Sequence, residues 1–261
     1  MTLLPFKDSK PLASVDLFCL PYAGGSSAVF RDWDSIFPDW ISVRPVEYPG
    51  RGTRMGQRRI EVPEDLVSSL LADLMREVRR PWAIFGHSLG AALGYELAKT
   101  PTATYPLVGF FPAGRHGPNC SDPAPRRSHL AREALIDEVR RLNGSPTAVL
   151  ANAELLELML PIIRSDFLLS ERISKCIELK ALSCPVHVFG GSDDPEVPQD
   201  TLSAWRATAG AGFGTTIVEG DHFFLQDDVC LSQMRSTIVE TLGQAVASQS
   251  CTETADKVRY G

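Results

Sequence analysis

The chain lacks the features that would place it in several specialised classes of protein. It has no apolar run of about 18 residues, the length that predicts a transmembrane helix, and its first residues do not have the pattern of a signal peptide. No Lys/Arg cluster is dense enough to neutralise many phosphates, and the net charge is −6. Neither a membrane nor a nucleic acid is therefore an expected partner, and we predict a cytoplasmic protein. We also expect a monomer.

The cysteines and the overall composition argue against further classes of protein and favour an ordinary globular domain. The six cysteines have no CxxC pair or other short spacing, which argues against a zinc site or a redox motif. Hydrophobic residues make up 44% of the sequence and charged residues 22%, as in ordinary globular domains. No linker or change in composition divides the chain, so we predict a single domain over residues 1–261. Nothing here indicates a metal ion or a cofactor, and the thiols are expected to be reduced.

Short apolar segments bounded by turn residues alternate with helical patterns along most of the chain. Apolar residues recur at helical spacing from Pro63 to Val78, and residues 91–98 are rich in helix-forming types. Strands are predicted at 15–20, 41–47, 82–85, 106–111, 185–189 and 215–218. This alternation predicts an α/β fold with a mostly parallel central sheet flanked by helices.

The alternation is interrupted between about residues 117 and 182, where no strand is predicted. Helical segments inserted after a central strand are typical of a lid over an active site, although they could equally be extra helices packed on the sheet. Residues 248–261 are polar and unpatterned, so we expect a frayed tail there.

Residues 86–90, Gly-His-Ser-Leu-Gly, match the G-x-S-x-G pattern, with a predicted strand before them and a helix after them. In this context a strained turn exposes the serine above the sheet, so Ser88 is the candidate nucleophile. The helix that follows would direct the Leu89 amide toward a developing oxyanion. A second amide is expected from the loop after the first strand, at Ala23.

A serine nucleophile needs a histidine base and an acid that orients the histidine, and in this fold the acid precedes the histidine in the chain. Of the five histidines, His222 follows the last predicted strand, where a loop can carry it over the sheet edge. Asp193 and Asp194 both follow the strand at 185–189. We favour Asp194 as the acid, because the residue before Pro195 is held extended, which leaves Asp193 to cap the turn.

Five segments together resemble the type II thioesterases that accompany nonribosomal peptide and polyketide synthases. These segments are residues 20–26, 48–51, 85–90, 190–195 and 220–224. The resemblance implies an α/β-hydrolase fold and hydrolysis of acyl thioesters on the phosphopantetheine arm of carrier proteins, which removes aberrant or stalled acyl groups. It also implies that the positions favoured above form the triad (Ser88, Asp194, His222) and the oxyanion hole (Ala23, Leu89).

The segment at 112–118 departs from the family pattern at Ala113 and at His116-Gly117, which leaves the shape of the pocket open. The chain has no phosphopantetheine attachment sequence of its own, so the resemblance implies an acyl or peptidyl carrier protein supplied in trans. Because such carriers are acidic, the lid and the arginines of the 51–59 loop are candidate docking surfaces. Those arginines are Arg51, Arg54, Arg58 and Arg59.

Other functions are compatible with the same pattern. A carboxylester hydrolase or lipase would use the same triad, because a fold does not fix the substrate. An acyltransferase or cyclase would also form an acyl-serine. A non-catalytic binding protein on the α/β-hydrolase scaffold is a further alternative, which the order of serine, acid and histidine disfavours. The sequence does not indicate which acyl chains fit.

Overall fold

The computed structural model describes residues 2–100, 104–118, 120, 126–142, 152–176 and 178–259. Its centre is a six-stranded sheet in the order β2-β1-β3-β4-β5-β6, and neighbouring strands pair in parallel throughout. The strands are β1 (Val15–Leu20), β2 (Ile41–Pro45), β3 (Trp82–His87), β4 (Leu107–Ala113), β5 (Val186–Gly191) and β6 (Phe213–Val218). The prediction of a mostly parallel sheet flanked by helices is confirmed.

The helices occupy most of the connections between strands. The α-helices are α1 (Trp33–Ile36), α2 (Pro63–Glu77), α3 (Leu89–Ala98), α4 (Arg132–Leu142), α6 (Ala153–Cys176), α7 (Gln199–Leu202) and α8 (Asp228–Arg259). Short 3-10 helices are η1 (Ser27–Phe30), η2 (Gly52–Arg54), η3 (Ser203–Thr208) and η4 (Phe224–Gln226). Pro63 begins α2, where its missing N–H has no intrahelical acceptor to lose.

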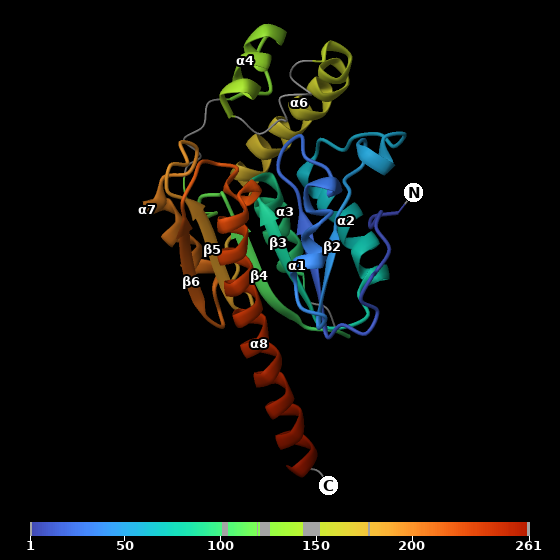
Figure 1. The fold of residues 1–261 in the computed structure, drawn as a ribbon, viewed down its shortest axis with the longest axis vertical. Coiled ribbons are helices and arrows are strands. Elements are labelled where there is room, and N and C mark those ends of the chain that lie inside the picture. Colours follow the sequence, from blue (N-terminus) through green and yellow to red (C-terminus); the bar gives the residue numbers. More distant parts are fainter. Residues whose placement is uncertain are drawn as a thin grey trace.

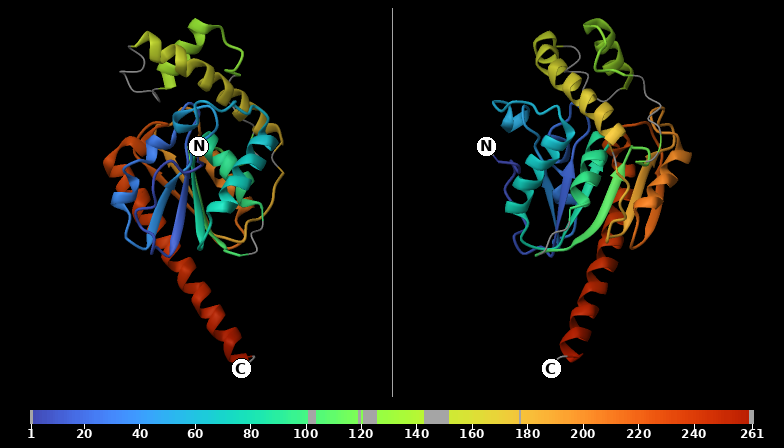
Figure 2. Two further views of the ribbon diagram at one scale, coloured as in Figure 1. Left: turned by 90° about the vertical axis from the view of Figure 1, so that its right-hand side faces the viewer. Right: turned by 180° about the vertical axis from the view of Figure 1, so that it is seen from behind.

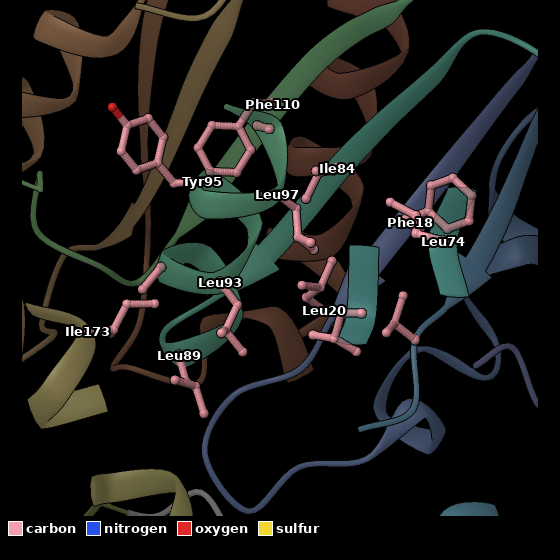
Figure 3. Packing of buried hydrophobic residues seen from close by; sticks show 14 of the residues in the cluster. Phe18, Leu20, Leu74, Ile84, Leu89, Leu93, Tyr95, Leu97, Phe110 and Ile173 are labelled. Carbon is pink, nitrogen blue, oxygen red and sulfur yellow. The ribbon is translucent and has the colours of Figure 1, made fainter. Parts of the chain in front are cut away.

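Helices cover both faces of the sheet (Figures 1 and 2). Because successive side chains of a strand point to opposite faces, each strand supplies residues to two separate apolar clusters. One cluster, seen in Figure 3, joins Phe18, Ile84 and Phe110 to helices α2 and α3. The other joins Leu17, Phe85 and Phe111 to α1 and α8. Strands β1 to β5 are therefore largely buried on both sides, which explains why they read as continuous apolar runs, whereas the edge strand β6 is partly exposed.

The order of the strands fixes where loops diverge. The chain leaves β1 toward β2 on one side and leaves β3 toward β4 on the other. Parallel sheets bind ligands at such a switch point, in the crevice beyond the carboxyl ends of the two strands. Here those ends are Leu20 and His87, and the loop that follows β3 contains Ser88.

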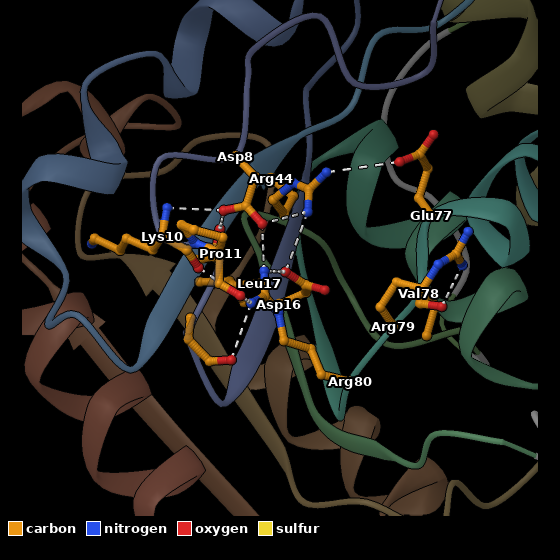
Figure 4. A network of polar contacts seen from close by, with 12 residues as sticks. Asp8, Lys10, Pro11, Asp16, Leu17, Arg44, Glu77, Val78, Arg79 and Arg80 are labelled. Carbon is orange, nitrogen blue, oxygen red and sulfur yellow. Dashed lines mark hydrogen bonds and ion pairs between the residues drawn. The ribbon is translucent and has the colours of Figure 1, made fainter.

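The other end of the sheet is held by buried ion pairs (Figure 4). Arg80 Nη2 lies 2.7 Å from Asp16 Oδ1 and 2.6 Å from Asp8 Oδ2. Arg44 Nη1 lies 3.4 Å from each of the same carboxylates. We call these four residues the Asp16 network. The Asp16 side chain is 1% exposed, so its charge depends on these partners.

Among the described residues between β4 and β5, α4 and α6 are the helices. Helix α4 and the first part of α6 lie beyond the carboxyl ends of the strands (Figures 1 and 2), whereas the last part of α6 packs on the apolar cluster seen in Figure 3 through Leu169 and Ile173. At the C-terminus α8 continues to Arg259, through most of the segment for which we expected a frayed tail. Residues 244–259 include neither glycine nor proline, so this part of α8 has no helix-breaking residue. No helix in the described part of the chain is long and apolar enough to span a membrane.

Helix α3 lies unusually close to the sheet at Gly94. A Cβ at this position would be 2.9 Å from Ile84 Cγ2 and 3.1 Å from Phe110 Cε2. Gly243, inside α8, has nothing within 4 Å of the same added atom. Packing therefore requires a glycine at Gly94, whereas the described surroundings of Gly243 leave room for a side chain.

Replacing each glycine by alanine tests this packing. Gly94→Ala is expected to lower the free energy of unfolding by about 1–3 kcal/mol, because the helix must move off the sheet. Gly243→Ala is expected to raise it by about 0.5–1 kcal/mol, because alanine favours the helix. Denaturant unfolding of both variants measures the difference, and equal effects would contradict the close packing of α3.

Candidate active site

Ser88 lies on a strained turn between β3 and α3. Its φ of 53° and ψ of −111° make it the one non-glycine residue of positive φ among the described residues. A Cβ at Gly86 would lie 2.2 Å from Gly90 O, and a Cβ at Gly90 would lie 2.1 Å from Leu20 O. Only glycines fit at these two positions, because backbone from β1, β3 and α3 meets there.

The turn leaves the Ser88 side chain free for chemistry. The Ser88 amide donates to Ala113 O of β4 at 2.8 Å, which ties the turn to the next strand. Although Ser88 occupies the N-cap position of α3, its hydroxyl makes no capping hydrogen bond. Ser88 and His222 both line a cavity of about 500 Å³. The residue predicted as nucleophile and the residue predicted as base therefore face the same space.

His222 lies in the loop between β6 and η4 and contacts Asp194 from the loop after β5. Its Nδ1 is 2.8 Å from Asp194 Oδ2, and the Asp194 side chain is 1% exposed. The other carboxylate oxygen, Oδ1, accepts hydrogen bonds from the amides of Glu196 at 2.8 Å and Val197 at 3.2 Å. Since the carboxylate accepts from Nδ1–H, Nε2 of His222 is the nitrogen that can take a proton.

The structure separates the two neighbouring aspartates. Asp193 is exposed, and its carboxylate accepts from the Ser192 hydroxyl at 2.8 Å. Its amide donates to Gly220 O at 2.9 Å, which links the loop after β5 to the loop that carries His222. Asp193 therefore belongs to the turn, and Asp194 is the aspartate in contact with the histidine.

His87, inside the turn sequence, supports the His222 loop. It is fully buried, and its Nε2 donates to the backbone carbonyl of His222 at 2.8 Å. Burial, and repulsion from the nearby His222 ring, hold the pKa of His87 well below its ordinary value. The neutral ring packs edge-on against Tyr22, with ring centroids 5.4 Å apart. His87 is thus a positioning residue that the sequence did not reveal as one.

The two amides expected at an oxyanion hole lie at the start of α3 and in the loop after β1. Leu89 is the first residue of α3, where an amide has no acceptor within the helix. In the loop, Gly24 N donates to Asp166 Oδ2 at 2.7 Å and Gly25 N to Tyr22 O at 2.9 Å. Ala23, just before them, lines the cavity.

The cavity has an apolar wall and a polar wall. The apolar wall comes from α4 and α6 and consists of Val139, Leu142, Met159, Ile163 and Phe167. The polar wall includes Arg115, His116, Arg127, Glu196 and Gln226. Arg115 is fixed by α6, because its guanidinium donates to the Ser170 hydroxyl at 2.8 Å and to that of Ser174 at 2.5 Å. The segment at 112–118, which departs from the family pattern, therefore forms part of the cavity.

Two of the four arginines offered above as a docking surface are buried, which corrects that expectation. Arg51 is 4% exposed and Arg54 5% exposed. Arg54 pairs with Asp73 at 3.2 Å, and Arg51 pairs with Asp166 at 2.5 Å. Both guanidinium groups are used inside the protein and cannot meet an acidic partner. Arg58 is exposed.

No group of three or more histidine, cysteine, aspartate or glutamate side chains within the described ranges is arranged to hold a metal ion. The chemistry available from the residues described is that of a serine, an acid–histidine pair and backbone amides. Such a set is suited to acyl transfer through a covalent acyl-serine.

The sheet, its flanking helices and the serine turn define the α/β-hydrolase class. A family model described as "Thioesterase domain" matches residues 15–238. The gramicidin S biosynthesis protein GrsT of Aneurinibacillus migulanus is 34% identical over 82% of this chain and 84% of its own. The chain belongs to the thioesterase family and is a thioester hydrolase.

Solved structures agree with this assignment. ClbQ from the colibactin NRPS/PKS pathway superposes with a TM-score of 0.82 and 31% identity, covering 90% of this chain and 100% of ClbQ. The type II thioesterase BorB from the borrelidin biosynthetic cluster gives a TM-score of 0.78 and 30% identity, covering 90% of this chain and 95% of BorB. The resemblance inferred from sequence segments is therefore confirmed at the level of the family.

Exchanging each neighbouring aspartate for asparagine tests the arrangement. Asp194→Asn is expected to lower kcat for an acyl thioester by about 10³- to 10⁴-fold, because the amide no longer holds His222 in the required tautomer. Asp193→Asn is the matched control and should leave kcat nearly unchanged. Steady-state kinetics on both variants decide the matter, and a larger loss at Asp193 would contradict the geometry.

Proposed function

We propose that this chain hydrolyses acyl thioesters carried on the phosphopantetheine arm of acyl or peptidyl carrier proteins. It would remove aberrant or stalled acyl groups during polyketide or nonribosomal peptide biosynthesis. The observation that carries the proposal is the His222–Asp194 pair at 2.8 Å, with His222 and Ser88 lining one cavity. Membership of the thioesterase family supports the choice of a thioester over other acyl compounds.

In the first half-reaction His222 Nε2 takes the proton of the Ser88 hydroxyl as its oxygen attacks the thioester carbonyl. The carbonyl oxygen becomes an oxyanion, to which the Ala23 and Leu89 amides donate. The tetrahedral intermediate collapses, the C–S bond breaks, and the proton on His222 passes to the departing thiolate. The products are an acyl-serine and a free pantetheine thiol.

In the second half-reaction water replaces the thiol. His222 removes a proton from water, and the resulting hydroxide attacks the acyl-serine ester. The same two amides stabilise the second oxyanion, and His222 returns the proton to Ser88 Oγ as the acid leaves. Asp194 keeps Nδ1 protonated throughout, and no atom of Asp194 is transferred.

The placement of α4 and α6 supports a lid over the acyl group. These helices contribute the apolar wall of the cavity, so an acyl chain bound to Ser88 would contact them. Ion pairs join α4 to the loop that carries Asp194. Arg141 Nη2 lies 2.7 Å from Glu196 Oε1 and 2.7 Å from Glu138 Oε1 of α4. Hydrogen bonds from Arg141, and then from Arg127, lower the pKa of Glu138 to about 2. Glu138 would therefore stay charged and paired with Arg141 at neutral pH.

Mass spectrometry of acyl-loaded carrier protein tests the function. Wild-type enzyme is expected to release the acyl group and leave the holo-carrier, whereas Ser88→Ala should release none above background, because no acyl-serine forms. Matched oxygen esters provide the comparison. Cleavage of the oxygen esters together with an intact acyl-carrier would indicate a carboxylester hydrolase. Transfer to an added nucleophile in place of water would indicate an acyltransferase.

A larger side chain in the apolar wall tests where the acyl group lies. Met159→Trp is expected to reduce kcat/KM for the longest accepted acyl chain at least tenfold, about 1.4 kcal/mol, and to spare short chains. Leu158, its neighbour on α6, is 61% exposed, so Leu158→Trp is the matched control. Kinetics over a series of acyl lengths give the comparison. A uniform loss at all lengths would place the acyl chain elsewhere.

A further inference from the structure

The loop after β1 is held by side chains from a segment that follows β2. Tyr48 donates its hydroxyl to Pro21 O at 3.0 Å, at the start of the loop. Glu47 accepts from the Ser27 hydroxyl at 2.8 Å and from the Ser27 amide at 3.2 Å, at its end. Both ends of the loop are therefore fixed to the same part of the chain.

The middle of the loop is held by a buried ion pair. Arg51 Nη1 lies 2.5 Å and Nη2 2.7 Å from the two oxygens of Asp166, which is fully buried in α6. Asp166 Oδ2 also accepts from Gly24 N at 2.7 Å, and Arg51 Nη1 donates to Gly25 O at 3.1 Å. The ion pair therefore binds the amide of Gly24 and the carbonyl of Gly25, which are consecutive residues.

The same contact sets the conformation of the loop. Gly24 has a φ of +79°, and an added Cβ would be 2.8 Å from Ile163 Cγ1 of α6. The Gly24 amide donates to Asp166 and the Gly25 amide donates to Tyr22 O. Among the hydrogen bonds of the described residues, none is donated by the Ala23 amide. The contacts around Gly24 therefore fix the peptide unit next to Ala23.

We infer that Asp166 and Arg51 are positioning residues for the oxyanion hole, which hold the Ala23 amide by fixing Gly24 and Gly25. This inference rests on the proposed function, since it uses the oxyanion role of Ala23. It adds that α6, whose residues Ile163 and Phe167 line the cavity, is bonded directly to the oxyanion loop. The helix that would contact the acyl chain and the loop that would stabilise the oxyanion form one unit.

The expected effect of losing Asp166 is on the transition state and not on substrate binding. In Asp166→Asn a single amide oxygen replaces two carboxylate oxygens that accept from Arg51 and Gly24, so the loop loses part of its anchorage. We expect kcat to fall about 100-fold with KM nearly unchanged, as for a displaced oxyanion donor. Affinity for an alkyl trifluoromethyl ketone, which forms a tetrahedral oxyanion adduct with the serine, should fall in parallel.

Asp16→Asn is the matched control, because Asp16 is 1% exposed and ion-paired in the Asp16 network at the opposite end of the sheet. Both variants should be less stable in denaturant unfolding, but Asp16→Asn should retain wild-type kcat and ketone affinity. Arg51→Lys is a second test that keeps the charge and loses the bidentate contact. If Asp166→Asn does not fold, this variant decides, with an intermediate loss of kcat expected.

Three outcomes in the variants would overturn the inference: wild-type kcat and ketone affinity in folded Asp166→Asn, a loss confined to KM, or an equal loss in Asp16→Asn. All measurements are repeated with an oxygen ester. If the wild-type enzyme cleaves the oxygen ester and not the thioester, the proposed substrate fails, whereas the comparison of variants still decides the role of Asp166. A wild-type enzyme inert toward both esters and the ketone would overturn the role and the proposed function together.

Discussion

The close approach of three backbone segments around Ser88 is the constraint on which the rest of the site depends. The end of β1, the end of β3 and the start of α3 meet where only Gly86 and Gly90 fit. This contact holds Ser88 at a positive φ, against the ordinary preference of a residue with a side chain. Such a strained conformation persists only where the surrounding structure holds it in place. The serine follows β3, a central strand that is fully buried and can do so.

The remaining parts of the site are attached to this turn by contacts that are distant in the sequence. His87, one residue before the serine, bonds to the backbone of His222, which lies 135 positions later. Asp166 bonds to Gly24 across 142 positions. The first contact joins the end of β3 to the loop that carries His222, and the second joins the loop after β1 to α6. The geometry of the candidate site therefore depends on the carboxyl edge of the sheet as a whole and on α6.

Much of the fold followed from local patterns. Apolar runs bounded by glycine and proline located every strand to within a few residues, because strands buried on both faces leave a strong signal. The helix from Pro63 was equally clear from its spacing. The short helices α1 and α7 were not predicted, because four residues give too little periodicity to recognise. No helix was predicted for residues 248–259 of α8, because polar residues without a pattern can still form a helix.

The candidates Ser88 and His222, and the two alternatives for the acid, could be selected from the sequence, because each lies in a short motif beside a strand. The sequence alone determined the class of fold and the order of serine, acid and histidine. Only the tertiary structure decided which aspartate contacts His222, that His87 supports that loop, and that Arg51 faces Asp166 in the interior. These contacts depend on side-chain direction and burial between separate segments, which lie 28 positions apart for Asp194 and His222 and 115 for Arg51 and Asp166. Local spacing carries no information about either.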